Sequence, residues 1–214
     1  FRILFFIVVL MVPVVGSSQS ECLHFDDGSY VGIGSNSINE ARTIELWFKL
    51  DEDFDQYETT IQSLLVRNTS GCDECDEVTV ALMSNGGTSL HGHLQFKWQK
   101  DGNVPIKIFS DTNAWSGGQW HHVAAVISEV DGMMMFIDGV KQQDVNQSQT
   151  QPITTSDTLA RIGRWGTAPN NPRYFHGNIE TVRISANARY NANFFPSCLD
   201  TLPDSNTMSL WLFN

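Results

Sequence analysis

The stretch QWHHVAAVISEVDGMMMFIDGVKQ, residues 119–142, predicts a β-hairpin and through it the fold of the chain. Residues 120–128 alternate apolar and other side chains as a strand does, and Asp131-Gly132 follows as a tight turn. Met133 to Ile137 is the expected return strand, which ends at a second Asp-Gly turn, 138–139. Asp-Gly favours the positive-φ turns whose twist matches paired strands.

The same stretch contains side chains that resemble a metal or catalytic site, namely two adjacent histidines and three consecutive methionines. Successive side chains of a strand point to opposite faces of its sheet. His121 and His122 therefore separate, and Met134 points away from Met133 and Met135, so the sulfurs cannot converge on one copper ion. We predict that these residues are structural.

Period-two patterns continue along the chain between Gly, Asn and Asp turns. This spacing predicts an all-β, antiparallel sandwich or barrel, with residues 20–214 forming one domain. One helical turn is expected, around 189–194. The expected strands are 43–50, 77–83, 93–99, 105–110, 121–128, 133–138, 160–165, 178–185 and 208–214.

The first residues resemble a secretory signal peptide that lacks its initiator methionine. Arg2 gives a short positive region, residues 3–15 are apolar, and the small residues 16–18 suit cleavage, so we assign 1–19 to the signal. The alternative is a membrane anchor, for which the apolar run is short and is interrupted by Pro13. No later segment is long and apolar enough to span a bilayer, so we expect a secreted or cell-surface protein.

The net charge of −11 bears on the class of partner. Nucleic-acid binding depends on clustered cations, and the sequence has no run of lysine or arginine, so nucleic acid is not an expected partner.

An even number of cysteines in an exported chain indicates disulfides, with three connectivities open. The Cys-x-x-Cys spacing could also serve redox chemistry or half a zinc site, but its acidic, Gly- and Ser-rich surroundings favour a loop staple. Two Asn-x-Ser/Thr sequons predict glycosylated surface loops at Asn68 and Asn146. The cysteines are Cys22, Cys72, Cys75 and Cys198.

Several stretches, in this order, resemble the laminin-G-like, pentraxin-like branch of the concanavalin A-like lectin/glucanase superfamily. The resemblance implies a two-sheet jelly roll whose closing strand, within 204–214, pairs beside the first. It thereby favours a Cys22–Cys198 staple and a local Cys72–Cys75 pair. The stretches are CLHFDDGSYVGIG (22–34), TIELWFKL (43–50), the hairpin at 120–139, ARIGRW (160–165) and YFHGNIETVRISANARYNANFFP (174–196).

Glycoside hydrolases of this superfamily need two carboxylates that flank the scissile bond. Here the strand at 43–50 carries only Glu45 and the strand at 178–185 only Glu180, so we expect no catalysis. Acidic residues cluster instead in a loop at 51–55, where Gln56 and Gln62 occupy positions that a calcium-binding EF-hand gives to Gly and Glu.

The resemblance implies a calcium site in the loop at 71–77, with Asp73, Glu74 and Asp76 as oxygen ligands. A second loop, 164–174, would complete it in relatives but offers no carboxylate here. We therefore expect calcium as the one candidate cofactor.

The loop at 164–174 is also the expected ligand site, since aromatic rings stack on sugars and amides hydrogen-bond to them. The alternative is that its tryptophan packs beneath its own loop. We predict a non-catalytic module that binds a glycan or extracellular glycoprotein; an adhesion domain without sugar specificity and a divergent glycosidase are the alternatives. The expected ligand-binding residues are Trp165, Asn170, Asn171, Arg173 and Tyr174.

Overall fold

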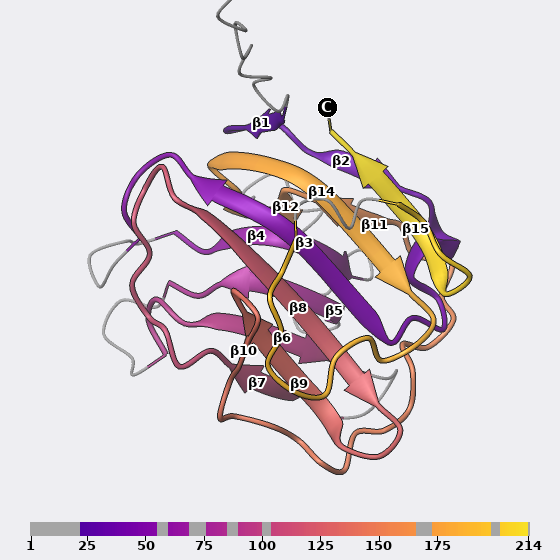
Figure 1. Cartoon of the computed structure of the whole chain (residues 1–214). Coiled ribbons are helices and arrows are strands. Elements are labelled where there is room, and N and C mark those ends of the chain that lie inside the picture. Colours follow the sequence, from indigo (N-terminus) through magenta and orange to yellow (C-terminus); the bar gives the residue numbers. More distant parts are fainter. Residues whose placement is uncertain are drawn as a thin grey trace, which may run out of the picture.

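The chain folds into two antiparallel β-sheets packed face to face (Figure 1). The computed structural model describes residues 22–54, 60–68, 76–84, 90–99, 104–165, 173–197 and 202–213. Within these ranges the helical structure is one 3₁₀ turn, η1, at Ser35–Ile38. None of the described residues form a helix long and apolar enough to cross a membrane.

The first layer is a seven-stranded sheet in which β15 also pairs with β14. Its main path runs in the order β1-β14-β3-β8-β9-β10. The strands are β1 (Leu23–Phe25), β3 (Thr43–Leu50), β8 (Trp120–Ser128), β9 (Gly132–Ile137), β10 (Val140–Lys141), β14 (Gly177–Ser185) and β15 (Thr207–Leu212).

The second layer is a six-stranded sheet in the order β2-β11-β4-β5-β6-β7. A small ribbon of β12 (Arg164–Trp165) and β13 (Arg173–Tyr174) lies against β4. The strands of the six-stranded sheet are β2 (Val31–Ile33), β4 (Gln62–Asn68), β5 (Asp76–Leu82), β6 (Leu94–Trp98), β7 (Ile106–Phe109) and β11 (Ala160–Ile162).

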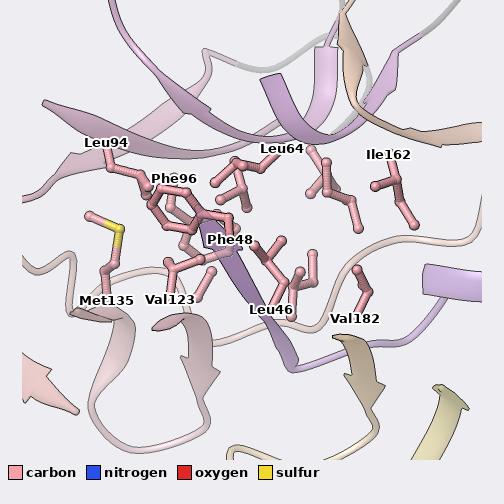
Figure 2. Close-up of a cluster of buried hydrophobic side chains, with 14 of the residues drawn as sticks. Leu46, Phe48, Leu64, Leu94, Phe96, Val123, Met135, Ile162 and Val182 are labelled. Atoms are coloured by element: carbon pink, nitrogen blue, oxygen red, sulfur yellow. The ribbon is translucent and has the colours of Figure 1, made fainter. Parts of the chain in front are cut away.

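The core lies between the two sheets, where alternate side chains of each strand interdigitate (Figure 2). Leu46, Phe48 and Met135 come from the seven-stranded sheet, while Phe96 and Ile162 come from the six-stranded one. All five are almost fully buried, and each such side chain contributes roughly 1.5–3 kcal/mol relative to exposure. The predicted fold class, an antiparallel sandwich of the jelly-roll kind, is confirmed.

The hairpin at 119–142 forms, but only one of its two turns is as predicted. Ser128 pairs with Gly132, so the first turn is 129–131 and Gly132 begins β9, whereas Asp131-Gly132 was the predicted turn. The second turn agrees with the prediction. Asp138 and Gly139 have φ of 49° and 78°, the two positive values that a type I′ turn needs. Met133 and Met135 lie in the core between the sheets, and Met134 lies on the outer face of the seven-stranded sheet. The histidines separate in the same way, so their predicted structural role agrees with the alternation of the sheet.

The predicted helical turn at 189–194 is wrong. Residues 186–197 run as an irregular strap across the outer face of the seven-stranded sheet (Figure 1). The rings of Tyr190 and Phe194 stack 3.7 Å apart over the apolar cluster that contains Met134 and Phe136. The backbone N–H of Phe194 donates to the carbonyl of Gly139 at 2.9 Å, which a helix over these residues would prevent.

A buried ionic network fixes this strap to the sheet. Glu45 accepts hydrogen bonds from the Arg183 guanidinium and from the Tyr190 hydroxyl, the latter at 2.6 Å. His122 Nε2 lies 3.5 Å from the same carboxylate. Burial alone would raise the pKa of Glu45, but the hydrogen bonds from His122, Arg183 and Tyr190 outweigh it and lower the pKa to about 2.

One of two finer predictions about the strands is confirmed, and the other differs from the structure. The bulge expected near 180–181 is confirmed, because the β14 register against β3 shifts between Ile179 and Val182. The closing strand β15, however, pairs with β14 and not with β1. Both terminal strands lie along the same edge of β14, one after the other, because β3 occupies its other edge.

Candidate functional site

The predicted ligand loop begins and ends in the β12–β13 ribbon. Arg164 pairs with Tyr174, and Trp165 pairs with Arg173. These four residues are described, whereas Asn170 and Asn171 lie outside the described residues. Of the five predicted ligand residues, the ribbon therefore brings Trp165 and Arg173 together on one face, while Tyr174 lies with Arg164 on the other.

Trp165 is part of the packing on the outer face of the six-stranded sheet. Only 6% of the residue is exposed, and it clusters with Val66 and Ala81. The Arg173 guanidinium lies over the indole, 4.8 Å from its centroid. In this arrangement the ring offers no free face for a sugar. Whether the tryptophan packs beneath its own loop stays a prediction, because 166–172 lie outside the described residues.

Sequence reasoning missed Tyr30 and Arg164, which provide the accessible surface. The Arg164 guanidinium lies 5.0 Å from the ring centroid of Tyr30 and 5.5 Å from that of Tyr174. Tyr30 is 46% exposed. We call this surface the arginine–aromatic patch; its residues are Tyr30, Arg161, Arg164 and Tyr174. Trp165 and Arg173 point to the other face of the ribbon.

Arg161 joins the patch because of strand alternation. Its neighbours Ala160 and Ile162 lie in the core, so Arg161 points to the outer face. It stands opposite Gly32 of β2, where a side chain built on the glycine would meet nothing within 4 Å. Burial and the positive charge of Arg164 together lower the pKa of Arg161, which indicates that the two guanidinium groups are close.

Among the described residues, two donors of the patch, Arg161 Nη1 and Arg164 Nε, are buried without a hydrogen-bond acceptor, as is Trp165 Nε1 on the other face of the ribbon. Within the described part of the chain, no carboxylate forms an ion pair with Arg161, Arg164 or Arg173. Buried donors without a partner are rare in native proteins and call for an explanation. The patch can therefore accept a ligand rich in acceptor oxygens.

An acidic cleft with a volume of about 400 Å³ lies at the start of β4, where Gln62 is part of its lining. Histidines pair with two of its carboxylates: His176 Nε2 is 2.9 Å from Asp27, and His24 Nε2 is 2.9 Å from Asp51. The backbone N–H of Gly117 donates to Asp53 at 2.8 Å. The cleft is lined by Asp26, Asp27, Asp51, Glu52, Asp53, Gln62 and His176.

These pairings engage the carboxylates of the cleft with side chains and backbone of the protein itself. In the ranges that the structure covers, no group of three or more His, Cys, Asp or Glu is placed to hold a metal ion. The backbone N–H of His176 donates to Gln62 at 3.0 Å, which links the cleft to the start of β4. Since Tyr174 is two residues away, the cleft lies near the patch but is built from different side chains.

The two loops from which the calcium site was predicted start at opposite ends of β4. Asp76 pairs with Asn68 at the end of that strand, whereas Gly163, just before β12, donates to Leu64 near its start. The strand's seven residues span roughly 20 Å. Asp73 and Glu74 lie outside the described residues, so calcium at 71–77 stays a prediction that rests on that loop alone.

The modification sites are placed in part. Asn68 is 2% exposed, while Asn146 is half-buried in a turn where its Oδ1 accepts from the Ser148 backbone at 3.1 Å. Glycosylation stays a prediction at both asparagines, and the burial of Asn68 favours Asn146 as the modified one.

The cysteines are placed only in part. Cys22 lies beside Asn178, whose side-chain amide is 3.1 Å from the Cys22 sulfur. Both disulfides stay predictions, because Cys72, Cys75 and Cys198 lie outside the described residues.

The sandwich and its strand order define the protein class as a jelly-roll β-sandwich. The family model of the concanavalin A-like lectin/glucanases superfamily matches residues 25–193, and the chain belongs to this family. A comparison with curated protein sequences finds no match.

Solved structures share the fold at low identity. The carbohydrate-binding module CBM40 of the Ruminococcus gnavus IT-sialidase, bound to α2,3-sialyllactose, is 18% identical with a TM-score of 0.59. That match covers 80% of this chain and 92% of the module. A putative carbohydrate-binding protein of Bacteroides ovatus is 17% identical, with a TM-score of 0.53 over 80% of this chain and 44% of that one. Domains LG4-5 of the mouse laminin α1 chain are 15% identical, with a TM-score of 0.52 over 83% and 48% of the two chains.

Proposed function

We propose that this chain is a non-catalytic recognition module that binds a glycan, free or on an extracellular glycoprotein, through the arginine–aromatic patch. The observation that carries the proposal is the pair of buried donors, Arg161 Nη1 and Arg164 Nε, which have no acceptor among the described residues and lie beside the exposed ring of Tyr30. Sugar hydroxyl and ring oxygens supply acceptors, and an aromatic ring supplies an apolar surface for a sugar face. The patch combines hydrogen-bond donors for such acceptors with an aromatic ring, side by side on the six-stranded sheet.

The structural relatives support the same class of function. One similar structure is a carbohydrate-binding module with sialyllactose bound, and another is described as a putative carbohydrate-binding protein. At these identities the likeness concerns the fold, so the patch itself carries the argument for sugar binding.

The positions of the candidate acids support a role without catalysis. Glu45 is held ionised by Arg183, Tyr190 and His122, with a pKa of about 2, and so is a poor general acid. Glu180 lies at the bulge of β14, and neither residue belongs to the lining of the acidic cleft. A panel of β-glucans should therefore remain intact; hydrolysis that disappears in Glu45→Gln or Glu180→Gln would contradict this part of the proposal.

The setting we propose is secreted or cell-surface, supported by the signal-like residues 1–19, the even cysteine count and the sequons. Calcium assistance is supported by the acidic sequence of 71–77. An adhesion domain without sugar specificity is the second candidate, and its support is the likeness to laminin LG4-5.

A glycan array tests the proposal. The mature chain, from residue 20, is applied with calcium and with EDTA, beside Tyr30→Ala and the control Val140→Ala, an exposed apolar residue of β10 on the other sheet. We expect glycans retained by the wild type and the control and lost by Tyr30→Ala. Binding that disappears in EDTA supports calcium assistance, and binding that persists removes it. An array without any retained glycan would refute the lectin-like function and leave the adhesion domain.

A further inference from the structure

We propose that the glycan bound by the patch is acidic, and that Arg161 and Arg164 hold its carboxylate or sulfate group. This inference rests on the proposed function, since it names the chemical class of ligand for the same site. It follows from three separate properties of the patch: its charge, its unpaired donors and the way its arginines are held.

Charge is the first property. The chain has 24 acidic and 13 basic residues, so carboxylates available for ion pairs outnumber the basic side chains. Arg161 and Arg164, at the junction of β11 and β12, nevertheless lie close to each other, and within the described residues neither has an ion-pair partner. Like charges at close range repel one another, so a bound anion would offset the repulsion between the two guanidinium groups.

The unpaired donors are the second property. Arg161 Nη1 and Arg164 Nε are excluded from solvent and meet no acceptor. A neutral hydroxyl could accept one of these hydrogen bonds, but a carboxylate or sulfate group accepts several at once. Hydrogen bonds from guanidinium to such an anion are shorter and stronger than those to neutral oxygen.

The third property is pre-organisation. Two tyrosine rings, Tyr30 and Tyr174, flank the Arg164 guanidinium at 5.0 and 5.5 Å. These contacts hold the guanidinium by cation–π attraction, so less side-chain entropy is lost on binding. Beside it, Gly32 leaves open space opposite Arg161, where a ring substituent fits without moving the backbone.

Together these properties describe an oxyanion site at the edge of an aromatic surface. The sugar ring contacts Tyr30 and the anionic substituent faces Arg161 and Arg164. The two sources of such an anion are a sugar acid and a sulfate ester, which share the chemistry that the arginines recognise.

Calorimetry with four probes tests the inference: 3′-sialyllactose, lactose, a heparin tetrasaccharide and its desulfated form. Arg161→Gln and Arg164→Gln are compared with the wild type and with Lys141→Gln, which removes one positive charge from β10 on the other sheet. We expect one acidic probe to bind and its neutral counterpart to bind at least tenfold more weakly. Each arginine variant should lose about tenfold or more for that probe, whereas Lys141→Gln should retain it.

The identity of the acidic probe distinguishes the sources, since sialyllactose reports a carboxylate and heparin a sulfate ester. Thermal unfolding of each variant checks that the loss is not a loss of folding. If a neutral glycan found on the array binds wild type and Arg161→Gln with equal affinity, the inference of an acidic ligand is overturned. Glycan recognition by the patch would remain intact. If the array retains no glycan at all, the proposed function itself fails.

Discussion

Each sheet of the sandwich carries an arginine–aromatic cluster on its outer face, and the two clusters differ in their counter-charge. On the seven-stranded sheet, Arg183 and Tyr190 surround the buried carboxylate of Glu45. On the six-stranded sheet, Arg164 contacts Tyr30 and Tyr174, and no carboxylate of the described residues pairs with it.

The difference separates a structural cluster from the proposed binding cluster, which is built of the same residue types. The compensated cluster fastens the strap at 186–197 to its sheet, so its charges are already used. The uncompensated cluster retains two charges and buried donors that no described residue satisfies. Counter-charge, more than composition, therefore distinguishes packing from recognition in this chain.

The largest expected effect comes from removing the counter-charge of the structural cluster. Glu45→Gln leaves Arg183 and Arg189 without the carboxylate that they face at the sheet. We expect the free energy of unfolding to fall by about 3–5 kcal/mol, as when one partner of a buried ion pair is lost. Urea denaturation measures this.

Glu129→Gln is the matched control, because Glu129 pairs with Arg42 at 2.9 Å but has a largely exposed side chain. Its loss should cost less than about 1 kcal/mol. Equal losses in the two variants would refute a special role for the buried network.

Acid should weaken the same network. The folded-state pKa of Glu45, about 2, lies below its ordinary value of 4.5. A depressed carboxyl pKa stabilises the fold fully above pH 4.5, and this contribution decreases as the pH falls from 4.5 towards 2. The loss amounts to about 3 kcal/mol.

Urea midpoints measured between pH 6 and pH 2, about the range in which carboxyl groups titrate, follow this loss. The slope between pH 4.5 and 2 should be shallower in Glu45→Gln than in the wild type. If the urea midpoints of wild type and Glu45→Gln fall in parallel as the pH decreases, other carboxyl groups account for the acid sensitivity.

The smallest expected effect compares one hydroxyl from each cluster. Tyr190→Phe removes the 2.6 Å hydrogen bond to Glu45 and should lower the free energy of unfolding by about 1.5–3 kcal/mol. Tyr30→Phe keeps the exposed ring and should change the free energy of unfolding by less than about 0.5 kcal/mol. Thermal denaturation of both proteins measures the contrast, and a larger cost for Tyr30→Phe would reverse the assignment of the two clusters.

Much of the fold was predictable because alternation is a local signal. The hairpin at 119–142 and the strand at 43–50 agree with the structure to within a residue or two. The strand at 62–68 was missed, because Leu64 and Leu65 both lie in the core at a register shift and so break the alternation. An inward Arg67, fully buried and bonded to Asn39 at 2.6 Å, hides the pattern further.

The candidate site was predicted less completely, since its residues meet across long stretches of sequence. Tyr30 and Arg164 are 134 positions apart in numbering, and only the sheet order β2-β11-β4 brings them together. Arg161 and Arg164 are three positions apart, a spacing that a continuous strand would place on opposite faces, and the break between β11 and β12 at Gly163, with a φ of 84°, was not visible in the alternation. The helical turn predicted at 189–194 fails for the same reason, because the contacts that hold these residues in the strap are to Glu45 and Gly139, far away in sequence.

The shared edge of β14 has a topological consequence. β15 ends opposite Thr181, β1 begins opposite Ile179, and the N–H of Phe213 donates to the carbonyl of Glu180 between them at 2.9 Å. Both strands run antiparallel to β14, so β15 leads directly into β1 (Figure 1). A circular permutant that joins residue 213 to residue 22 through a short linker would form one continuous strand along this edge of β14. A pulling force applied at residues 213 and 22 would detach β15 and β1 from β14, starting where the two strands meet.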